Sequence, residues 1–365
     1  MWGWVGCACC PALRRGLAIL AALIVPLAAA GAMAQVAPAL GGDAICANAP
    51  GARLELRCRL ALAGGRSIGG AEFAALAGLA RAQGRIDGLA DPPRLRPFAT
   101  PILRHESDIN GGNPARPLIL GNLVFTGDPA RARRAGVVAG AEIGLSLRHA
   151  HPPGLRLGLL AAWSGVTDGA GGPGIRTVRV QGCAERDLLR GWFAEGCAEI
   201  QRSLREFARS DTRATTLRLG RVFTTRGGIH AEASGAAARM RLDFAGQNRL
   251  IGRFDMILPA GWHGGVQVMA GSAMPERHAV RREGVVRLRL PVGARWVQLE
   301  ASVAAASGSN YVGIARTETI LGATLTVPLG GMLRLSAGYW RTRASIDYFA
   351  TEGPAVALGF PPLRF

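Results

Sequence analysis

From Pro97 to the end of the chain, apolar and polar residues alternate in runs of about ten positions that end at Gly-, Pro- or Asn-rich breaks. Successive side chains of an extended strand point to opposite faces, so this period of two predicts strands with one apolar and one polar face. The run from Arg295 to Ala305 is the clearest: Val297, Leu299, Ala301 and Val303 share one face, and Gln298, Glu300 and Ser302 share the other. The runs Val285 to Val292 and Met332 to Arg341 repeat the pattern.

A soluble sandwich gives the same alternation, so strand length and the content of the polar face must decide. Strands of roughly ten residues suit a tilted bilayer crossing, which takes about 9 to 11, whereas strands of soluble proteins usually have about 5 or 6. The polar faces here carry arginines such as Arg287, Arg289 and Arg334. A membrane barrel accepts charge in its lumen but needs an apolar outside. We therefore predict an all-β fold, a transmembrane antiparallel β-barrel over residues 97–365, with these three arginines facing the lumen.

The first 34 residues have the pattern of a secretory signal peptide. Arg14 and Arg15 precede an apolar run from Leu17 to Ala30, and a small-residue box ending at Ala34 follows. The apolar run is shorter than the roughly 20 residues that a membrane-spanning helix needs. Cleavage between Ala34 and Gln35 is therefore expected, and it would export the chain from the cytoplasm.

Residues 35–96 form a short segment before the predicted barrel. It contains an alternating run at Arg53 to Leu62, a predicted helix at Ala71 to Gln83, and a stiff break at Asp91-Pro92-Pro93. The segment is too short for a substantial core of its own without a disulfide or a partner surface. We interpret it as a small periplasmic lead-in or a plug.

Four cysteines remain after the signal peptide: Cys46, Cys58, Cys183 and Cys197. In an exported chain they are free to oxidise, and they fall into two pairs that are local in sequence. Neither pair has the close spacing or the adjacent histidine of a zinc site. We expect disulfides between Cys46 and Cys58 and between Cys183 and Cys197, although four cysteines allow three connectivities.

The formal charge is +18 at pH 7, from 43 basic residues, all of them arginine, and 25 acidic ones. Such an excess raises the question of nucleic acid as a partner. The arginines are spread along the chain, however, and aromatic residues at 6% are too few to supply stacking platforms for bases. We expect no nucleic-acid partner and anticipate that the charge meets anionic lipid headgroups of an outer membrane.

The stretch from Glu185 to Arg209 permits two interpretations. As a helix it would align apolar residues such as Trp192 and Ile200. As a strand from Trp192 to Ile200 it would turn Glu195 and Glu199 inward. Within a barrel we prefer the strand, with the second disulfide stapling its hairpin.

The chain ends in Phe365, with Leu363 two residues earlier. A terminal aromatic residue in this setting resembles the C-terminal signal that outer-membrane barrels present to their insertion machinery. Pro361 and Pro362 interrupt the alternation, and proline cannot donate to a strand ladder. We therefore expect the closing strand to be bent or edge-exposed there.

Two stretches at the ends of the predicted barrel resemble a known family. They read PFATPILRHESDINGGNPARPLILGNLVFTGDPARARRAGVVAGAEIGLSLRH from Pro97 and YWRTRASIDYFATEGPAVALGFPPLRF at the end. The residues that carry the resemblance are Pro101, Asp108, Asn110, Asn113, Phe125, Asp128, Pro129, Arg341, Arg343, Ser345, Ile346, Tyr348, Arg364 and Phe365. The chain is similar there to the barrel domain of surface lipoprotein assembly modifiers. The resemblance implies about 14 strands, which residues 97–365 accommodate, and a role in bringing lipoproteins or secreted proteins to the cell surface.

The sequence shows no catalytic motif: it has no Gly-x-Ser-x-Gly elbow, no His-Glu-x-x-His and, lacking lysine, no phosphate-binding loop. Glu106, Asp108 and Asn110 carry oxygen ligands for calcium but not a full set, so a polar loop that orders the first hairpin is the simpler interpretation. We predict no enzymatic activity, cofactor or metal site. Two functions remain: translocation or surface display of lipoproteins or secreted partners, or a passive pore whose arginine-rich lumen favours anionic solutes.

Overall fold

The structure is a computed structural model that describes residues 46, 49, 52–63, 70–83, 85, 91–120, 122–169, 172–258, 261–274, 276–292, 295–309, 314–330 and 333–364. The chain divides into two units, residues 1–41 and residues 42–365, and the described residues all lie in the second. The predicted signal peptide, with its cleavage between Ala34 and Gln35, lies outside the described residues.

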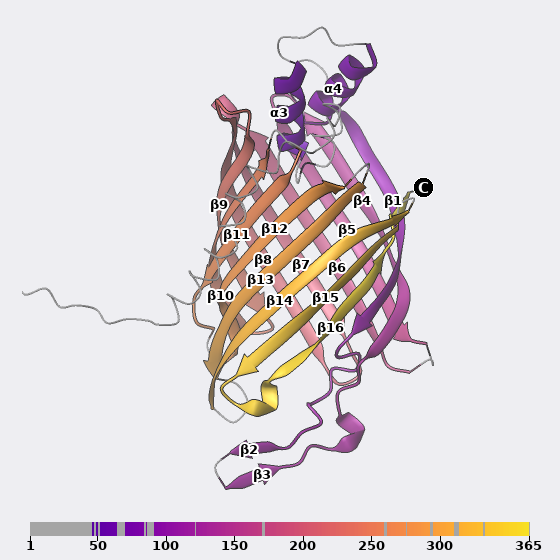
Figure 1. Cartoon of the computed structure of the whole chain (residues 1–365), viewed down its shortest axis with the longest axis vertical. Helices are drawn as coiled ribbons and strands as arrows, with labels where there is room; N and C mark the ends of the chain where they lie inside the picture. Colours follow the sequence, from indigo (N-terminus) through magenta and orange to yellow (C-terminus); the bar gives the residue numbers. More distant parts are fainter. Residues whose placement is uncertain are drawn as a thin grey trace, which may run out of the picture. The chain divides into compact units, whose positions relative to one another are not determined.

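Fourteen strands of the described chain form one closed antiparallel β-barrel (Figure 1). Each strand pairs with the next, and the barrel closes where β16 pairs with β1, with Ile102 opposite Gly359. Closure leaves no free sheet edge, so the backbone groups of every strand find partners within the barrel. The prediction of an all-β barrel with about 14 strands is confirmed. The strands are β1 (Asp91–Glu106), β4 (Gly136–His151), β5 (Leu155–Asp168), β6 (Gly174–Asp187), β7 (Trp192–Leu204), β8 (Arg209–Thr224), β9 (His230–Leu242), β10 (Ala245–Ile257), β11 (His263–Gly271), β12 (Ala279–Val292), β13 (Arg295–Ser309), β14 (Ala315–Gly330), β15 (Leu333–Ala344) and β16 (Thr351–Gly359).

The two faces of the wall differ as the alternation predicts. Outward-facing leucines are among the most exposed side chains, with 73% of Leu217 and 67% of Leu250 accessible. On β12 and β13 the register pairs Leu288 with Leu299 on the outer face and Arg287 with Glu300 on the inner face. The outer wall is therefore apolar, while charged side chains lie in the lumen.

The barrel begins earlier than the sequence indicates. Strand β1 starts at Asp91 instead of Pro97, so the predicted break at Asp91-Pro92-Pro93 forms the start of a strand. Proline is accommodated there because the register shifts between Asp91 and Arg94, which interrupts the ladder of strand pairs at that point.

The predicted interruption of the closing strand is confirmed. Strand β16 ends at Gly359, before the two prolines, and the chain then pairs with β1 through the short strand β17 (Leu363–Arg364). Leu363 lies opposite Ala99. Phe365, the other residue of the predicted insertion signal, lies outside the described residues.

The strand interpretation of the ambiguous stretch is confirmed, because Trp192 to Leu204 form β7. A helix there is wrong; only the short 3-10 turn η3 (Leu189–Gly191) precedes the strand. The extended conformation is stabilised by strand pairing on both edges, because β7 pairs along its length with β6 and β8.

Two helices precede the barrel, α3 (Ala52–Ala63) and α4 (Gly70–Ala82). Helix α4 matches the predicted helix, but the alternating run at Arg53 to Leu62 is helical and not extended. Its residues Leu54 and Cys58 also satisfy the i, i+4 spacing of a helix face, and a closed barrel offers no free edge that an added strand could pair with. No helix in the described ranges is long and apolar enough to cross a membrane.

The two ends of the barrel are unlike. Helices α3 and α4 and the end of the chain lie at one end (Figure 1). The longest connection, residues 107–135, lies at the other and extends as the small hairpin of β2 (Leu118–Leu120) and β3 (Leu123–Phe125). We call these the helix end and the hairpin end.

Candidate functional site

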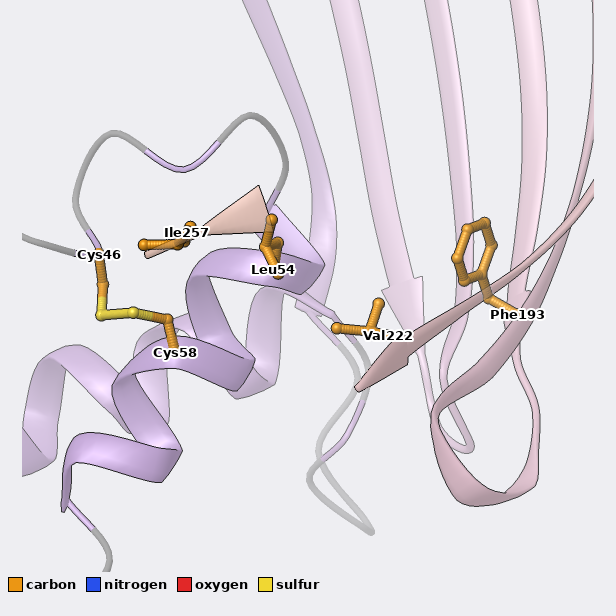
Figure 2. Close-up of a cluster of buried hydrophobic side chains, with 6 residues drawn as sticks. All are labelled: Cys46, Leu54, Cys58, Phe193, Val222 and Ile257. Carbon is orange, nitrogen blue, oxygen red and sulfur yellow. A yellow bond between two sulfur atoms is a disulfide. The ribbon is translucent and has the colours of Figure 1, made fainter. Parts of the chain in front are cut away.

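Helix α3 packs against the inner wall at the helix end. Leu54, which is fully buried, contributes to an apolar cluster with Phe193, Val222 and Ile257 of three different strands (Figure 2). The disulfide between Cys46 and Cys58 joins the same cluster, with a Cα–Cα distance of 5.7 Å. Burying a leucine side chain stabilises by roughly 1.5–3 kcal/mol. The cluster thus holds the helix in the mouth of the barrel.

Phe193 can reach α3 because Gly220 lies beside it on β8. A Cβ atom at position 220 would come within 2.4 Å of the ring carbon Cζ of Phe193. The ring in turn lies under the guanidinium of Arg53, with Cζ of the arginine 3.4 Å from the ring centroid. A glycine on one strand therefore positions the aromatic platform that contacts the helix.

Arg53 carries the polar part of the contact. Its guanidinium, on a side chain only 8% exposed, forms an ion pair with Glu185 and lies 3.8 Å from Glu195 and 3.7 Å from Glu232. Glu185 and Glu195 are directly opposite each other on β6 and β7. Like charges in that arrangement repel, so Arg53 between them adds to the compensation that Arg156 and Arg218 of the wall provide.

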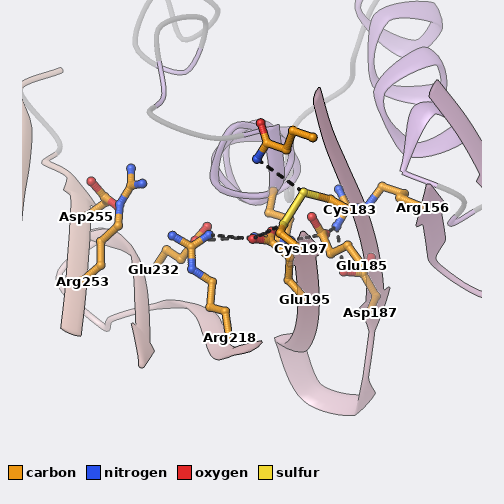
Figure 3. A network of polar contacts seen from close by, with 12 residues as sticks. Arg156, Cys183, Glu185, Asp187, Glu195, Cys197, Arg218, Glu232, Arg253 and Asp255 are labelled. Carbon is orange, nitrogen blue, oxygen red and sulfur yellow. Dashed lines mark hydrogen bonds and ion pairs between the residues drawn. A yellow bond between two sulfur atoms is a disulfide. The ribbon is translucent and has the colours of Figure 1, made fainter. Parts of the chain in front are cut away.

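A wider network surrounds these groups (Figure 3). The wall contributes five carboxylates and three arginines to it: Glu185, Asp187, Glu195, Glu232, Asp255, Arg156, Arg218 and Arg253. The contacts are Arg156 to Asp187 at 3.3 Å, Arg218 to Glu195 at 3.5 Å, Arg253 to Asp255 at 2.5 Å, and the pair Arg156–Glu185. The segment before the barrel adds two arginines, Arg53 and Arg85, the latter 2.7 Å from Asp187. With both present, the charges of the network balance.

The second predicted disulfide lies beside this network. Cys183 and Cys197 are cross-strand partners on β6 and β7, with a Cα–Cα distance of 4.2 Å. They face the lumen, two residues away from Glu185 and Glu195. The bond therefore staples the strands that present the acidic pair, as the expected hairpin staple implies.

The three arginines that were predicted to face the lumen lie on the inner face of the barrel wall. Arg287 pairs with Glu300 at 2.7 Å, and Arg289 donates a hydrogen bond to the uncharged Gln298 at 2.8 Å. Arg334 is on β15, opposite Gly359 and in the inward-facing series with Ser336. They belong to β12 and β15, on a part of the wall separate from the acidic strands β6, β7, β9 and β10.

At the hairpin end, the connection after β1 folds back into the lumen. Ile109 packs with Val138, Val166 and Ile175, and the neighbouring Asn110 is fully buried. The oxygen ligands considered for calcium are engaged locally instead. The carboxylate of Asp108 accepts hydrogen bonds from the backbone N–H groups of residues 111 and 112, and the side chain of Asn110 donates to a backbone carbonyl at 2.8 Å. The described residues hold no metal-ligand cluster, and the polar-loop interpretation explains these contacts.

Local patterns do not bring Arg53 to this site, although the sequence contains one signal for it. Pairing Cys183 with Cys197 fixes an antiparallel register, and that register puts Glu185 opposite Glu195. Two inward carboxylates side by side require a cation. The exported segment before the barrel was the place to look for it.

No protein-family model matches the chain, and no curated protein matches it either. Among solved structures, the chain is similar to the β domain of the Bordetella autotransporter BrkA, with 16% identity, a TM-score of 0.31, and coverage of 74% of this chain and 98% of that one. It is also similar to a BenF-like porin from Pseudomonas fluorescens Pf-5, with 9% identity, a TM-score of 0.39, and coverage of 75% and 99%. A third is Pseudomonas aeruginosa OccK2 in complex with glucuronate, with 8% identity, a TM-score of 0.38, and coverage of 75% and 98%. At these TM-scores they identify neither a family nor a ligand.

Proposed function

We propose that this chain is an outer-membrane channel for anionic solutes and that α3 closes it at the periplasmic end. The observation that carries the proposal is the closed barrel whose outer wall is apolar and whose lumen is charged. Outer-membrane barrels have short periplasmic turns and longer extracellular loops. The long connection of residues 107–135 then faces outward, and α3 faces the periplasm.

The preference for anions follows from how the lumen charges are matched. The acidic strands are balanced by the wall arginines together with Arg53 and Arg85. On the other part of the wall, β12 and β15 present three arginines to the lumen, Arg287, Arg289 and Arg334, and Arg287 pairs with Glu300. A path along β12 and β15 is thus positive, which favours anions.

Planar-bilayer recordings of the purified protein in a salt gradient test this. We expect a zero-current potential of the sign for anion selectivity, which shifts toward cations in Arg289→Gln/Arg334→Gln. The matched control is Arg341→Gln/Arg343→Gln, which removes the same charge from the outer face of β15 and should leave selectivity unchanged. Cation selectivity in the unaltered protein, or equal behaviour of the two double variants, would sink the proposal.

A second function, translocation or surface display of lipoproteins or secreted proteins, is supported by the resemblance of the barrel's two ends and by one observation. The hairpin β2–β3 exposes Ile119, Leu123, Val124 and Phe125 beyond the barrel. A two-stranded hairpin is marginal in water alone, so a client protein is a fitting cover. Co-expression with a lipoprotein tests it: surface protease accessibility of the lipoprotein should require this chain and fall when residues 118–125 are deleted. Accessibility independent of the chain would contradict this role.

A further inference from the structure

Three arginines cluster on the outer wall near the hairpin end. Arg213 on β8 is directly opposite Arg241 on β9, and Arg239 lies two residues from Arg241. All three are exposed. They share the outer face with Leu217 and Leu219 of β8, which belong to the same alternating series. The cluster thus points toward whatever surrounds the barrel.

None of these three arginines forms an ion pair with another described residue. Their neighbours differ: Arg202 and Arg209 lie 2.7 and 3.0 Å from Asp211, and Arg277 lies 3.0 Å from Asp243. Like charges directly opposite on a sheet are destabilising. In the lumen the opposed acidic pair has Arg53 between its members, whereas the opposed arginines outside form no ion pair with any described residue. An anion from the surroundings would supply a counter-charge for these arginines.

An apolar hollow of about 1030 Å³ begins at this cluster and continues along the outer wall. One row of cross-strand partners across β7 to β10 alternates small and large residues: Gly196, Leu217, Ala237 and Leu250. The next row brings Ala198 and Arg239 to the hollow. Small residues between protruding leucines leave a groove, and Arg239 lies at its end. The groove is as large as a pocket for a small-molecule ligand.

We propose that this groove binds a lipid of the outer leaflet, with an acyl chain along β7 to β10 and a phosphate of its headgroup held by Arg213, Arg239 and Arg241. The inference rests on the proposed outer-membrane orientation, which places the hairpin end outward. The headgroup level of a bilayer then coincides with the arginines at the strand ends, and its hydrocarbon with the hollow. Guanidinium groups bind phosphate through paired, charge-assisted hydrogen bonds.

Native mass spectrometry of the folded protein in detergent tests the proposal, with bisphosphorylated lipid A, inorganic phosphate and diacylglycerol as probes. We expect lipid A adducts on the unaltered protein and at least about tenfold weaker binding in the variant Arg213→Gln/Arg239→Gln/Arg241→Gln. The matched control removes the same charge from exposed positions at the helix end, Arg186→Gln/Arg190→Gln/Arg221→Gln, and should bind as the unaltered protein does. Inorganic phosphate should compete weakly and diacylglycerol should bind poorly.

Equal lipid A binding by the two triple variants would overturn the proposal. So would full competition by inorganic phosphate, which would indicate a site for free phosphate, or diacylglycerol binding as strong as that of lipid A. Should the triple variant fail to fold, Ala198→Trp fills the groove while keeping all three arginines, and it should weaken lipid A binding as well. A boiling-dependent gel shift of each sample separates the two proposals. A protein that shifts but does not bind lipid A refutes the lipid site alone, and a protein with no shift refutes the barrel in the membrane.

Discussion

Replacing Arg53 with methionine keeps most of the side-chain volume and removes the only charge that α3 itself places among the carboxylates Glu185, Glu195 and Glu232. Removing one partner of a buried ion pair usually costs about 3–5 kcal/mol, because the other charge is left uncompensated. The side chains of those carboxylates are 10–20% exposed to solvent. Some water remains available to them, and Arg156 and Arg218 still pair with Glu185 and Glu195, so we expect the lower end, about 3 kcal/mol.

That free energy acts on the equilibrium between docked and undocked α3, and about 1.4 kcal/mol corresponds to a tenfold change. Arg53→Met should therefore raise the undocked fraction by roughly a hundredfold, until undocking is no longer rare. In planar bilayers the unaltered protein should be mostly closed at the helix end, and the variant should show more frequent or longer openings.

The control variant is Arg59→Met, on the same helix, whose ion pair is with Glu55 of that helix at 3.0 Å and not with the barrel. It should conduct like the unaltered protein. Pairing Arg53→Met with Glu185→Gln should recover part of the docking, because the double variant leaves fewer uncompensated charges. Equal open probabilities for Arg53→Met and the unaltered protein would refute the reasoning that α3 closes the barrel through this arginine.

The first disulfide, Gly220 and His278 provide three further tests. Changing Cys46 and Cys58 to serine removes a disulfide whose cysteines are 12 residues apart in sequence. This change should weaken α3 docking by about 2–3 kcal/mol and raise conductance. Changing Cys183 and Cys197 to serine should not raise conductance. Gly220→Val places a Cβ against the ring of Phe193 and should raise conductance through an overpacking cost of about 1–3 kcal/mol, with Gly220→Ala smaller in effect. Burial lowers the pKa of His278 to about 4, so the folded state resists a proton that the unfolded chain accepts below about 6.5. The temperature of the gel-mobility transition should then fall between pH 7 and pH 5, and fall less in His278→Gln.

The strands could be predicted because one local rule determines them. In β12 and β13 each residue is either in lipid or in the lumen, so the polarity of Arg287 or Leu299 reports its face directly. The disulfide pairs were predictable because the two cysteines of each pair are close in sequence, 12 residues apart in one pair and 14 in the other. The start of β1 was not, because proline normally argues against a strand, and the register shift between Asp91 and Arg94 is a contact across strands that the local sequence does not show.

The docking of α3 in the barrel depends on contacts that are distant in sequence. Arg53 and Glu185 lie on different elements, and nothing in either segment alone shows that they meet. The run around Arg53 alternates as a strand does, but Leu54 and Cys58 also fit one helix face, and the closed wall leaves no edge for an added strand. The register deduced from Cys183 and Cys197 would have identified the acidic pair, but not the residue that balances it.

Every function proposed for this chain requires a closed barrel in the outer membrane, and heat-modifiable gel mobility tests this most directly. Unboiled and boiled samples of the isolated outer-membrane fraction are compared on one gel. We predict that the protein is found in that fraction and migrates differently before and after boiling, because the closed barrel resists detergent until it is heated. A protein found in the soluble periplasmic fraction, with the same mobility in both samples, would contradict the barrel in the membrane and every function proposed for it.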